Sequence, residues 1–353
     1  MQTEKDIAEI AGAGLTWVRL PIGFWAIETF PGEPFLARTS WTYVIRVLQW
    51  CRKYGLRVNL ALQAVPGSQN GFNHGGKSES LNFLNGVMGM ANAQRTLYYI
   101  RVLTEFISQP EWLNVVPMLS ILNEPQAASI GVDQLRSFYV EAHRIVREVT
   151  GFGKGKGPFV VINDGFASSS VFNGFMNGAD RVIVERQAYI AFSAFSQVAT
   201  DSVTARIMQQ ACASAPVMDQ SRSNFGITLA GAFSLAFSDC GFYVRGVNTT
   251  STYEGDCSFW ENSKNWGLAL KASLTQLALA QMDALGDYFF FTWKASLTSF
   301  ARQQRGKSKH RSGHTSSDCR KVGFPMILGR HWEHARPLMD RTLRLGMALM
   351  LPG

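Results

Sequence analysis

The stretch VVPMLSILNEP, residues 115–125, carries the strongest fold signal in this 353-residue chain. Its first eight residues are almost continuously apolar, which is typical of a β-strand buried on both faces. The run stops at Asn123-Glu124-Pro125, where two polar side chains and a proline end the strand. A strand covered on both faces predicts helices packed on either side of a sheet.

Similar apolar segments recur along the chain and alternate with segments of helical period. The other expected strands cover residues 15–20, 56–62, 159–163, 181–189, 227–233 and 288–293. The expected helices cover residues 3–12, 40–54, 91–108, 132–149 and 266–285. This alternation predicts an α/β fold with a parallel sheet, and its spacing favours a (β/α)8 TIM barrel. Only seven strands are found and the sequence starts on a helix. The barrel is therefore expected to be incomplete, with the first strand and last helix missing or replaced.

Composition excludes several classes of protein. Hydrophobic residues make up 46% of the chain and charged residues 17%, which excludes wholesale disorder. No apolar stretch is long enough to span a bilayer, so no membrane partner is expected. The five cysteines include no CxxC pair, and neither a metal nor an organic cofactor is expected. The first six residues, MQTEKD, have neither the basic nor the apolar region of a signal peptide.

The net charge of +8 is confined to the C-terminal end. Residues 301–353 hold 11 Lys and Arg but three acids, and subtracting these from totals of 34 and 26 leaves 23 of each sign in residues 1–300. A neutral body with a basic tail does not form a basic groove, so no nucleic-acid partner is expected. The interpretation is a barrel over residues 1–300 and a basic tail of uncertain structure over residues 301–353.

Asn123 and Glu124 are the sharpest candidates for chemistry. In an α/β barrel, catalytic side chains lie at the carboxyl ends of the strands, where these two residues fall. The carboxyl group could protonate a leaving oxygen while the amide holds a substrate hydroxyl. The same three residues also make a good strand-ending turn. Taken alone, the motif does not choose between the two interpretations.

Several longer motifs decide between them. They are TEKDIAEIAGAGLTWVRLPIGFWAIE (3–28), VPGSQNGF (65–72), LNEP (122–125), LAGAFSLAFSDC (229–240) and YFFFTWK (288–294). In this order they resemble the fungal exo-β-1,3-glucanases, or glucan 1,3-β-glucosidases, of glycoside hydrolase family 5. The resemblance implies a (β/α)8 barrel and a retaining mechanism with two Glu residues, one the acid/base and the other the nucleophile.

The resemblance also implies roles for individual residues. Glu124 matches the acid/base and Asn123 its neighbouring amide. Arg19 and Tyr189 match an arginine and a tyrosine that lie beside the nucleophile. The nucleophile position itself is Ala232, in Gly231-Ala232-Phe233-Ser234, where the family has a Glu. A methyl group cannot attack an anomeric carbon or stabilise an oxocarbenium ion.

Three further positions depart from the family pattern. Gln63 and Gln187 each replace a family His, and Phe291 replaces a Trp that forms a sugar platform. Glutamine can hydrogen-bond a hydroxyl but does not titrate near neutral pH, and phenylalanine stacks on a sugar with less area. The expected substrate-binding residues are Arg19, Gln63, Asn70, Asn123, Gln187, Tyr189 and Phe291.

These observations predict a degenerate homologue, or pseudoenzyme, that has lost its nucleophile and still binds β-1,3-glucan or its oligosaccharides. One alternative is a residually active retaining β-glucosidase or exo-β-1,3-glucanase of glucan catabolism, with Glu124 as acid/base. Here Glu185 is the one other acid that could take part, although a salt bridge at the rim is the simpler role for it. Another alternative is a non-functional truncated product.

The resemblance carries further implications. Cys240 and Cys257 match a family disulfide, which suits an oxidising compartment. The protein is expected to be extracellular or in the cell wall, although the first residues show no signal peptide. It is expected to be a monomer whose partner is β-glucan or a gluco-oligosaccharide.

Overall fold

A computed structural model of the protein describes residues 3–193, 203–241, 243–261 and 266–293. Its centre is a sheet of seven parallel strands in the order β1-β2-β3-β4-β5-β6-β7. The strands are β1 (Trp17–Gly23), β2 (Arg57–Ala64), β3 (Met118–Ser120), β4 (Phe159–Asn163), β5 (Val182–Gln187), β6 (Thr228–Phe233) and β7 (Tyr288–Phe290). All seven strands predicted from the sequence are therefore confirmed, each paired with its neighbour along the chain.

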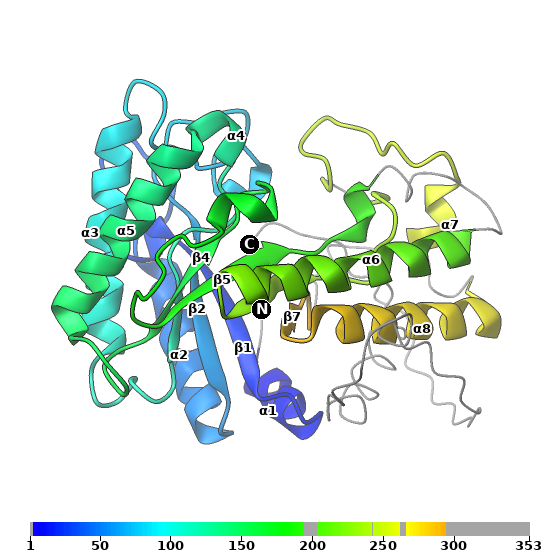
Figure 1. Ribbon diagram of the computed structural model, residues 1–353, viewed down its shortest axis with the longest axis horizontal. Coiled ribbons are helices and arrows are strands. Elements are labelled where there is room, and N and C mark those ends of the chain that lie inside the picture. Colours follow the sequence, from blue (N-terminus) through cyan, green and yellow to red (C-terminus); the bar gives the residue numbers. More distant parts are fainter. Residues whose placement is uncertain (1–2, 194–202, 242, 262–265, 294–353) are drawn as a thin grey trace.

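Helices cover the outside of this sheet (Figure 1). They are α1 (Glu4–Gly12), α2 (Thr39–Lys53), α3 (Gly89–Ile107), α4 (Ala127–Ile130), α5 (Val132–Thr150), α6 (Val203–Asn224), α7 (Cys257–Glu261) and α8 (Leu268–Leu285). Five of them match the predicted helices. Helix α6 was not predicted; it packs along α8 on one side of the sheet, as Figure 1 shows.

Because side chains alternate along each strand, the sheet has one apolar layer on its outer face and another on its inner face. In β5, Val184 belongs to the large cluster between the sheet and the outer helices. Its neighbour Ile183 packs with Val161 and Leu229 in a separate small cluster. Successive strand residues point to opposite faces, so this second cluster fills the inside of the curved sheet. The next inward position of β5 is Glu185, which brings a charge into the barrel.

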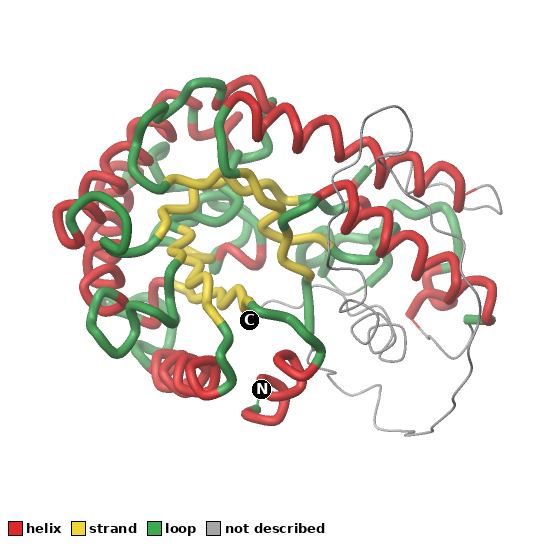
Figure 2. Tube along the Cα trace, turned by 60° about the horizontal axis from the view of Figure 1, so that its bottom comes forward, coloured by secondary structure: helices red, strands yellow, loops and turns green. Residues whose placement is uncertain are grey.

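The sheet curves into a nearly closed barrel (Figure 2). Within the described ranges, the ladder begins at β1 and ends at β7, and no pairing joins these two strands. The prediction of an incomplete (β/α)8 barrel is thus confirmed. The carboxyl ends of the strands still share one rim, which is where side chains for chemistry are expected.

The predicted basic tail, residues 301–353, lies outside the described residues. In the part of the chain that is described, no helix combines the length and apolar character required to cross a bilayer.

Candidate active site

A buried ion pair inside the barrel anchors the candidate site. Arg19, on β1, binds Glu185, on β5, through two contacts: Nη1 to Oε2 at 2.6 Å and Nη2 to Oε1 at 3.1 Å. Glu185 is fully buried, and its carboxylate also accepts from Ser120 Oγ at 3.3 Å and Asn163 Nδ2 at 3.3 Å. Since each carboxylate oxygen binds one guanidinium nitrogen of Arg19, the charge is satisfied.

The ion pair between Arg19 and Glu185 also explains why residue 231 is a glycine. A Cβ built on Gly231, in β6, would lie 2.8 Å from Glu185 Oε2, which is closer than side-chain atoms approach. Arg19 Nη1 also lies 3.5 Å from the Gly231 carbonyl oxygen. A side chain at residue 231 would therefore collide with the ion pair, so the backbone of β6 approaches it directly.

Asn123 links this ion pair to Glu124. Its Oδ1 accepts from Arg19 Nη2 at 3.0 Å and from Gln187 Nε2 at 3.4 Å. Its Nδ2 donates to Glu124 Oε2 at 3.0 Å. Because the oxygen of the Asn123 amide binds Arg19 and its nitrogen binds Glu124, this side chain fixes the Glu124 carboxyl group relative to Arg19.

Glu124 lies just beyond β3, where its backbone adopts the left-handed region at φ 46°. Its side chain is largely buried, and its Oε2 lies 2.8 Å from His74 Nε2. Its carbonyl oxygen accepts from Asn70 Nδ2 at 3.1 Å, while Gln69 Nε2 binds the carbonyl of Asn123 at 2.8 Å. The loop that contains residues 65–72 thus holds this unusual backbone turn in place.

His74 was missed by the sequence analysis. It lies two residues beyond the motif VPGSQNGF, in the short 3-10 turn Asn73–Gly75, and its ring also contacts that of Phe72. Its position after a motif already assigned to the site was the only available signal. A single histidine in a loop has no pattern of its own.

The strand register pairs Ala232 of β6 with Gln187 of β5, directly after an irregularity that skips Gly231. The backbone of β5 continues to follow it, because Ala188 N donates to the Ala232 carbonyl at 2.9 Å. Gln187 Oε1 is buried and has no hydrogen-bond partner among the described residues. A buried acceptor such as this is costly to leave unpaired unless a ligand or water binds there.

Tyr189 follows β5 at the same rim. Burial raises the pKa of its hydroxyl, and the charges of Glu124, Arg19 and Glu185 also act on it. It therefore stays protonated and can serve as a donor to a carboxylate or a sugar oxygen.

Two other buried carboxylates lie near this end of the sheet. Asp164, after β4, forms an ion pair with Arg186 at 3.1 Å, and burial raises its pKa to about 6. Arg186 alternates with the inward-facing Glu185 and Gln187, so this pair lies on the outer side of the strand. Asp239, beyond β6, is held by the loop described below.

Glu185 is a salt-bridge partner as the simpler interpretation proposed, although it lies inside the barrel rather than at its rim.

The remaining predicted residues lie at the same end. Gln63 is the penultimate residue of β2, and its carbonyl accepts from Gln69 Nε2 at 2.8 Å. Asn70 uses its amide to hold the Glu124 carbonyl and the Phe72 N–H, so both ends of the amide are bound within the protein. Phe291 follows β7, with its N–H bound to the Phe233 carbonyl at 2.8 Å. Direct sugar contact by these three residues stays a prediction.

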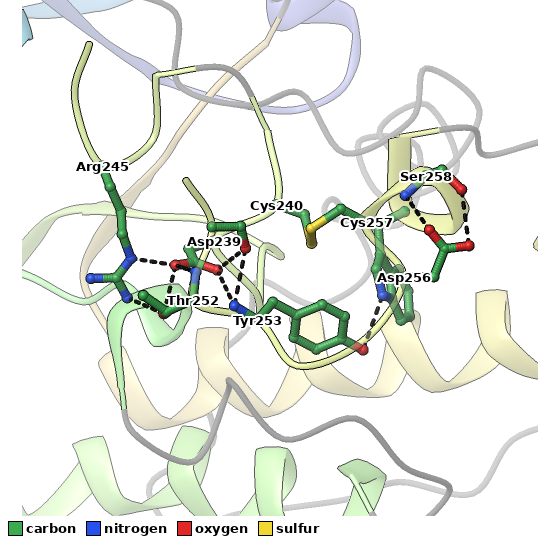
Figure 3. The surroundings of a disulfide bond; sticks show 10 residues. Asp239, Cys240, Arg245, Thr252, Tyr253, Asp256, Cys257 and Ser258 are labelled. Atoms are coloured by element: carbon green, nitrogen blue, oxygen red, sulfur yellow. Dashed lines mark hydrogen bonds and ion pairs between the residues drawn. A yellow bond between two sulfur atoms is a disulfide. The ribbon is translucent and has the colours of Figure 1, made fainter. Parts of the chain in front are cut away.

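A disulfide joins Cys240 to Cys257, with the Cα atoms 5.2 Å apart. Figure 3 shows the adjacent Asp239 as the hub of the loop between them. This carboxylate accepts from Ser251 Oγ at 2.5 Å, from Thr252 N at 2.8 Å and from Tyr253 N at 3.1 Å, and it pairs with Arg245. The loop also meets the site, because Asn73 Nδ2 donates to the Tyr243 carbonyl at 3.1 Å.

Among the described residues, no group of three or more His, Cys, Asp or Glu side chains is arranged to hold a metal ion. What the site offers is proton transfer and hydrogen bonding: one carboxyl group held by an amide and a histidine, one phenol and one open amide oxygen.

Comparison with known proteins places this geometry in context. No protein-family model matches the chain. The probable glucan 1,3-beta-glucosidase D of Aspergillus clavatus is 32% identical over 263 residues, which cover 74% of this chain and 31% of that protein. The corresponding protein of Aspergillus niger is 30% identical over 307 residues, covering 86% of this chain and 36% of the relative. The chain thus spans about a third of the length of these curated relatives.

Solved structures agree on the fold. The crystal structure of rutinosidase from Aspergillus niger superposes with a TM-score of 0.62 at 15% identity, covering 85% of this chain and 76% of that one. A broad-specificity endoglucanase of subfamily GH5-4 from Clostridium longisporum gives a TM-score of 0.54 at 13% identity, covering 98% and 86%. The chain is therefore a homologue of the fungal proteins named glucan 1,3-beta-glucosidase D, built on the barrel seen in family 5 glycoside hydrolases.

Proposed function

We propose that this protein binds β-1,3-linked gluco-oligosaccharides at the carboxyl end of the barrel and does not cleave them by double displacement. The observation that carries the proposal is the pair formed by Gln187 and Ala232 across β5 and β6. Gln187 Oε1 is a buried acceptor without a hydrogen-bond partner among the described residues, and Ala232 carries only a methyl group where a retaining glycosidase needs a carboxylate. A sugar hydroxyl that donates to Gln187 Oε1 would satisfy this acceptor.

Two other buried acids at this end of the barrel, one inside it and one on its outer side, support the loss of catalysis. Glu185 is held by four donor contacts, two of them from Arg19, and Asp164 is paired with Arg186. A nucleophile must leave its partners to attack, and breaking a buried ion pair costs about 3–5 kcal/mol. Neither carboxylate is therefore a ready substitute for the missing one.

The alternative is residual hydrolysis that depends on Glu124. The observation in its favour is the intact contact network of Glu124 with Asn123 and His74. A carboxyl group held in this way can still donate a proton to a leaving oxygen. In this case, water or another group would have to replace the nucleophile.

Calorimetry with laminari-oligosaccharides and glucose release from laminarin separate these possibilities. We expect saturable heat of binding and no glucose above the background of heat-treated protein. Glucose release that disappears in Glu124→Gln and persists in the exposed control Glu105→Gln would instead establish the alternative. If a folded protein gives no heat at millimolar oligosaccharide, the binding proposal is wrong.

The site of action is part of the proposal. The disulfide between Cys240 and Cys257 suits an oxidising compartment, so we place the protein outside the cell or in the cell wall, acting as a monomer.

A further inference from the structure

The loop closed by Cys240 and Cys257, here called the disulfide loop (residues 240–257), contains a feature that sugar binding does not use. The segment Asn248-Thr249-Thr250 is the only Asn-X-Ser/Thr sequence, with X other than Pro, in the 353 residues. All three residues are exposed. Asn248 lies in a turn at φ 61°, a left-handed conformation that asparagine adopts more readily than most residues.

The side chains around Asn248 leave its amide open to solvent. Thr249 Oγ1 donates to the Gly246 carbonyl at 2.9 Å, whereas no hydrogen bond of the described residues involves the Asn248 amide. The loop is fixed on both sides of it, by the disulfide and by the contacts of Asp239 with Arg245 and Thr252 (Figure 3). A bulky polar group attached to Asn248 would therefore extend into water, without displacing any of these contacts.

We propose that Asn248 carries an N-linked glycan. In the transfer step, Asn248 Nδ2 forms a bond to the anomeric carbon of an oligosaccharide carried on a lipid pyrophosphate. The bond from that carbon to the pyrophosphate oxygen breaks, the lipid pyrophosphate leaves with the electron pair, and the amide loses one proton. The transferase and the lipid-linked donor come from the secretory compartment.

Two independent observations point to that compartment. The sequence motif is the acceptor for the membrane-bound transferase that attaches N-linked glycans. The motif lies between the two cysteines of the disulfide, which are 17 residues apart. Disulfides form and persist in the same oxidising lumen in which N-glycosylation occurs. This inference does not depend on oligosaccharide binding, because the acceptor amide is not part of the candidate active site.

The test is translation of the full chain, fused to a cleavable secretion leader, in the presence of microsomes. Protease protection identifies the translocated product, and treatment with a peptide-N-glycosidase identifies any glycan. The matched pair of variants is Thr250→Ala, which destroys the motif, and Thr249→Ala, which keeps it. Asn248→Asp removes the acceptor while tolerating the left-handed backbone.

We expect one glycan on the translocated wild type and on Thr249→Ala, seen as a mobility shift of one oligosaccharide that the glycosidase removes. Thr250→Ala and Asn248→Asp should migrate as the unmodified chain. A protease-protected wild type without a glycosidase-sensitive shift overturns the proposal, and so does a shift that survives in Thr250→Ala. Since microsomes modify the chain as it emerges, a variant that folds poorly still gives a result.

Discussion

Gln187 and Ala232 show how two neutral side chains change the chemistry of a site. A carboxylate at position 232 would need donors nearby, whereas the methyl group of Ala232 needs none, and the Oε1 acceptor of Gln187 has no partner among the described residues. The sequence alone revealed both residues, because each departs from a motif that surrounds it. It could not reveal that the two residues are paired in the β5–β6 register, since register is set by strand pairing.

The open acceptor of Gln187 gives the first prediction. Gln187→Leu keeps the approximate volume but removes the acceptor and the Nε2 contact with Asn123. If a sugar hydroxyl binds there, the affinity for laminari-oligosaccharide should fall by about 1 kcal/mol, or roughly fivefold. Calorimetry measures this, and an unchanged dissociation constant would show that the ligand does not reach β5.

Restoring a carboxylate gives the second prediction. Ala232→Glu should raise glucose release from laminarin from background by roughly 100-fold, which is a small part of what an essential catalytic group contributes in a serine protease. Adding Gln187→His should raise it further, since a ring N–H can donate to the new carboxylate.

The matched control for this gain is Ala232→Gln, which has the same shape without the charge. It should remain at background. Equal activity of the Gln and Glu variants would mean that the added side chain does not act as a nucleophile, and the interpretation of position 232 would be wrong.

The strands were predictable because each is an apolar run with a polar stop. The lengths of the strands were less predictable. The apolar run begins at residue 115, but β3 begins at Met118, because Pro117 has no N–H to give to the ladder. Helix α6 was missed because it contains Pro216 and lacks an apolar stripe, so its helical state depends on packing against α8. His74 was missed for a related reason, since only the folded loop brings it to Glu124.

The disulfide loop gives the third prediction. Burial opposes ionisation of Asp239, but hydrogen bonds from Ser251, Arg245 and Thr252 outweigh this effect and lower its pKa. Its contribution to the free energy of unfolding is therefore present near neutral pH and is lost as the pH falls. Asp239→Asn removes the charge and should lower the free energy of unfolding by about 3 kcal/mol at pH 7.

Urea denaturation followed by circular dichroism measures this change. Asp256→Asn is the control, because Asp256 is an exposed acid of the same loop whose hydrogen bonds are local, to Ser258 and the backbone of Phe259. It should change the free energy by less than about 0.5 kcal/mol. Equal effects of the two variants would mean that Asp239 is not the hub of the loop.

The barrel as assembled combines an apolar outer layer with a small polar interior at one end. The ion pair of Arg19 and Glu185 crosses from β1 to β5, so it ties together strands that are not neighbours in the sheet. In the described sheet β1 and β7 do not pair with each other, so this contact restrains a curvature that the described strand hydrogen bonds alone do not close. The sequence indicated an incomplete barrel and a salt bridge for Glu185, but it did not identify Arg19 as the partner, because the two residues are 166 positions apart.

A buried acid on the outer side of this barrel makes stability depend on pH. Burial raises the pKa of Asp164 to about 6, whereas an unfolded Asp titrates near 4. Between these values the folded state binds more protons, so the contribution of Asp164 to the free energy of unfolding decreases as the pH rises from about 4 to about 6. The full change is about 3 kcal/mol for a shift of roughly two pKa units.

Asp164→Asn cannot titrate, so the difference in unfolding free energy between wild type and variant should depend on pH across this interval and be flat above it. The acids with lowered pKa values, such as Glu33 and Asp180, contribute the opposite slope equally to both proteins. They therefore cancel in the difference, even though the variant also loses the ion pair with Arg186. A difference that stays constant from pH 4 to pH 7 would show that Asp164 is ionised throughout, with Arg186 outweighing the effect of burial.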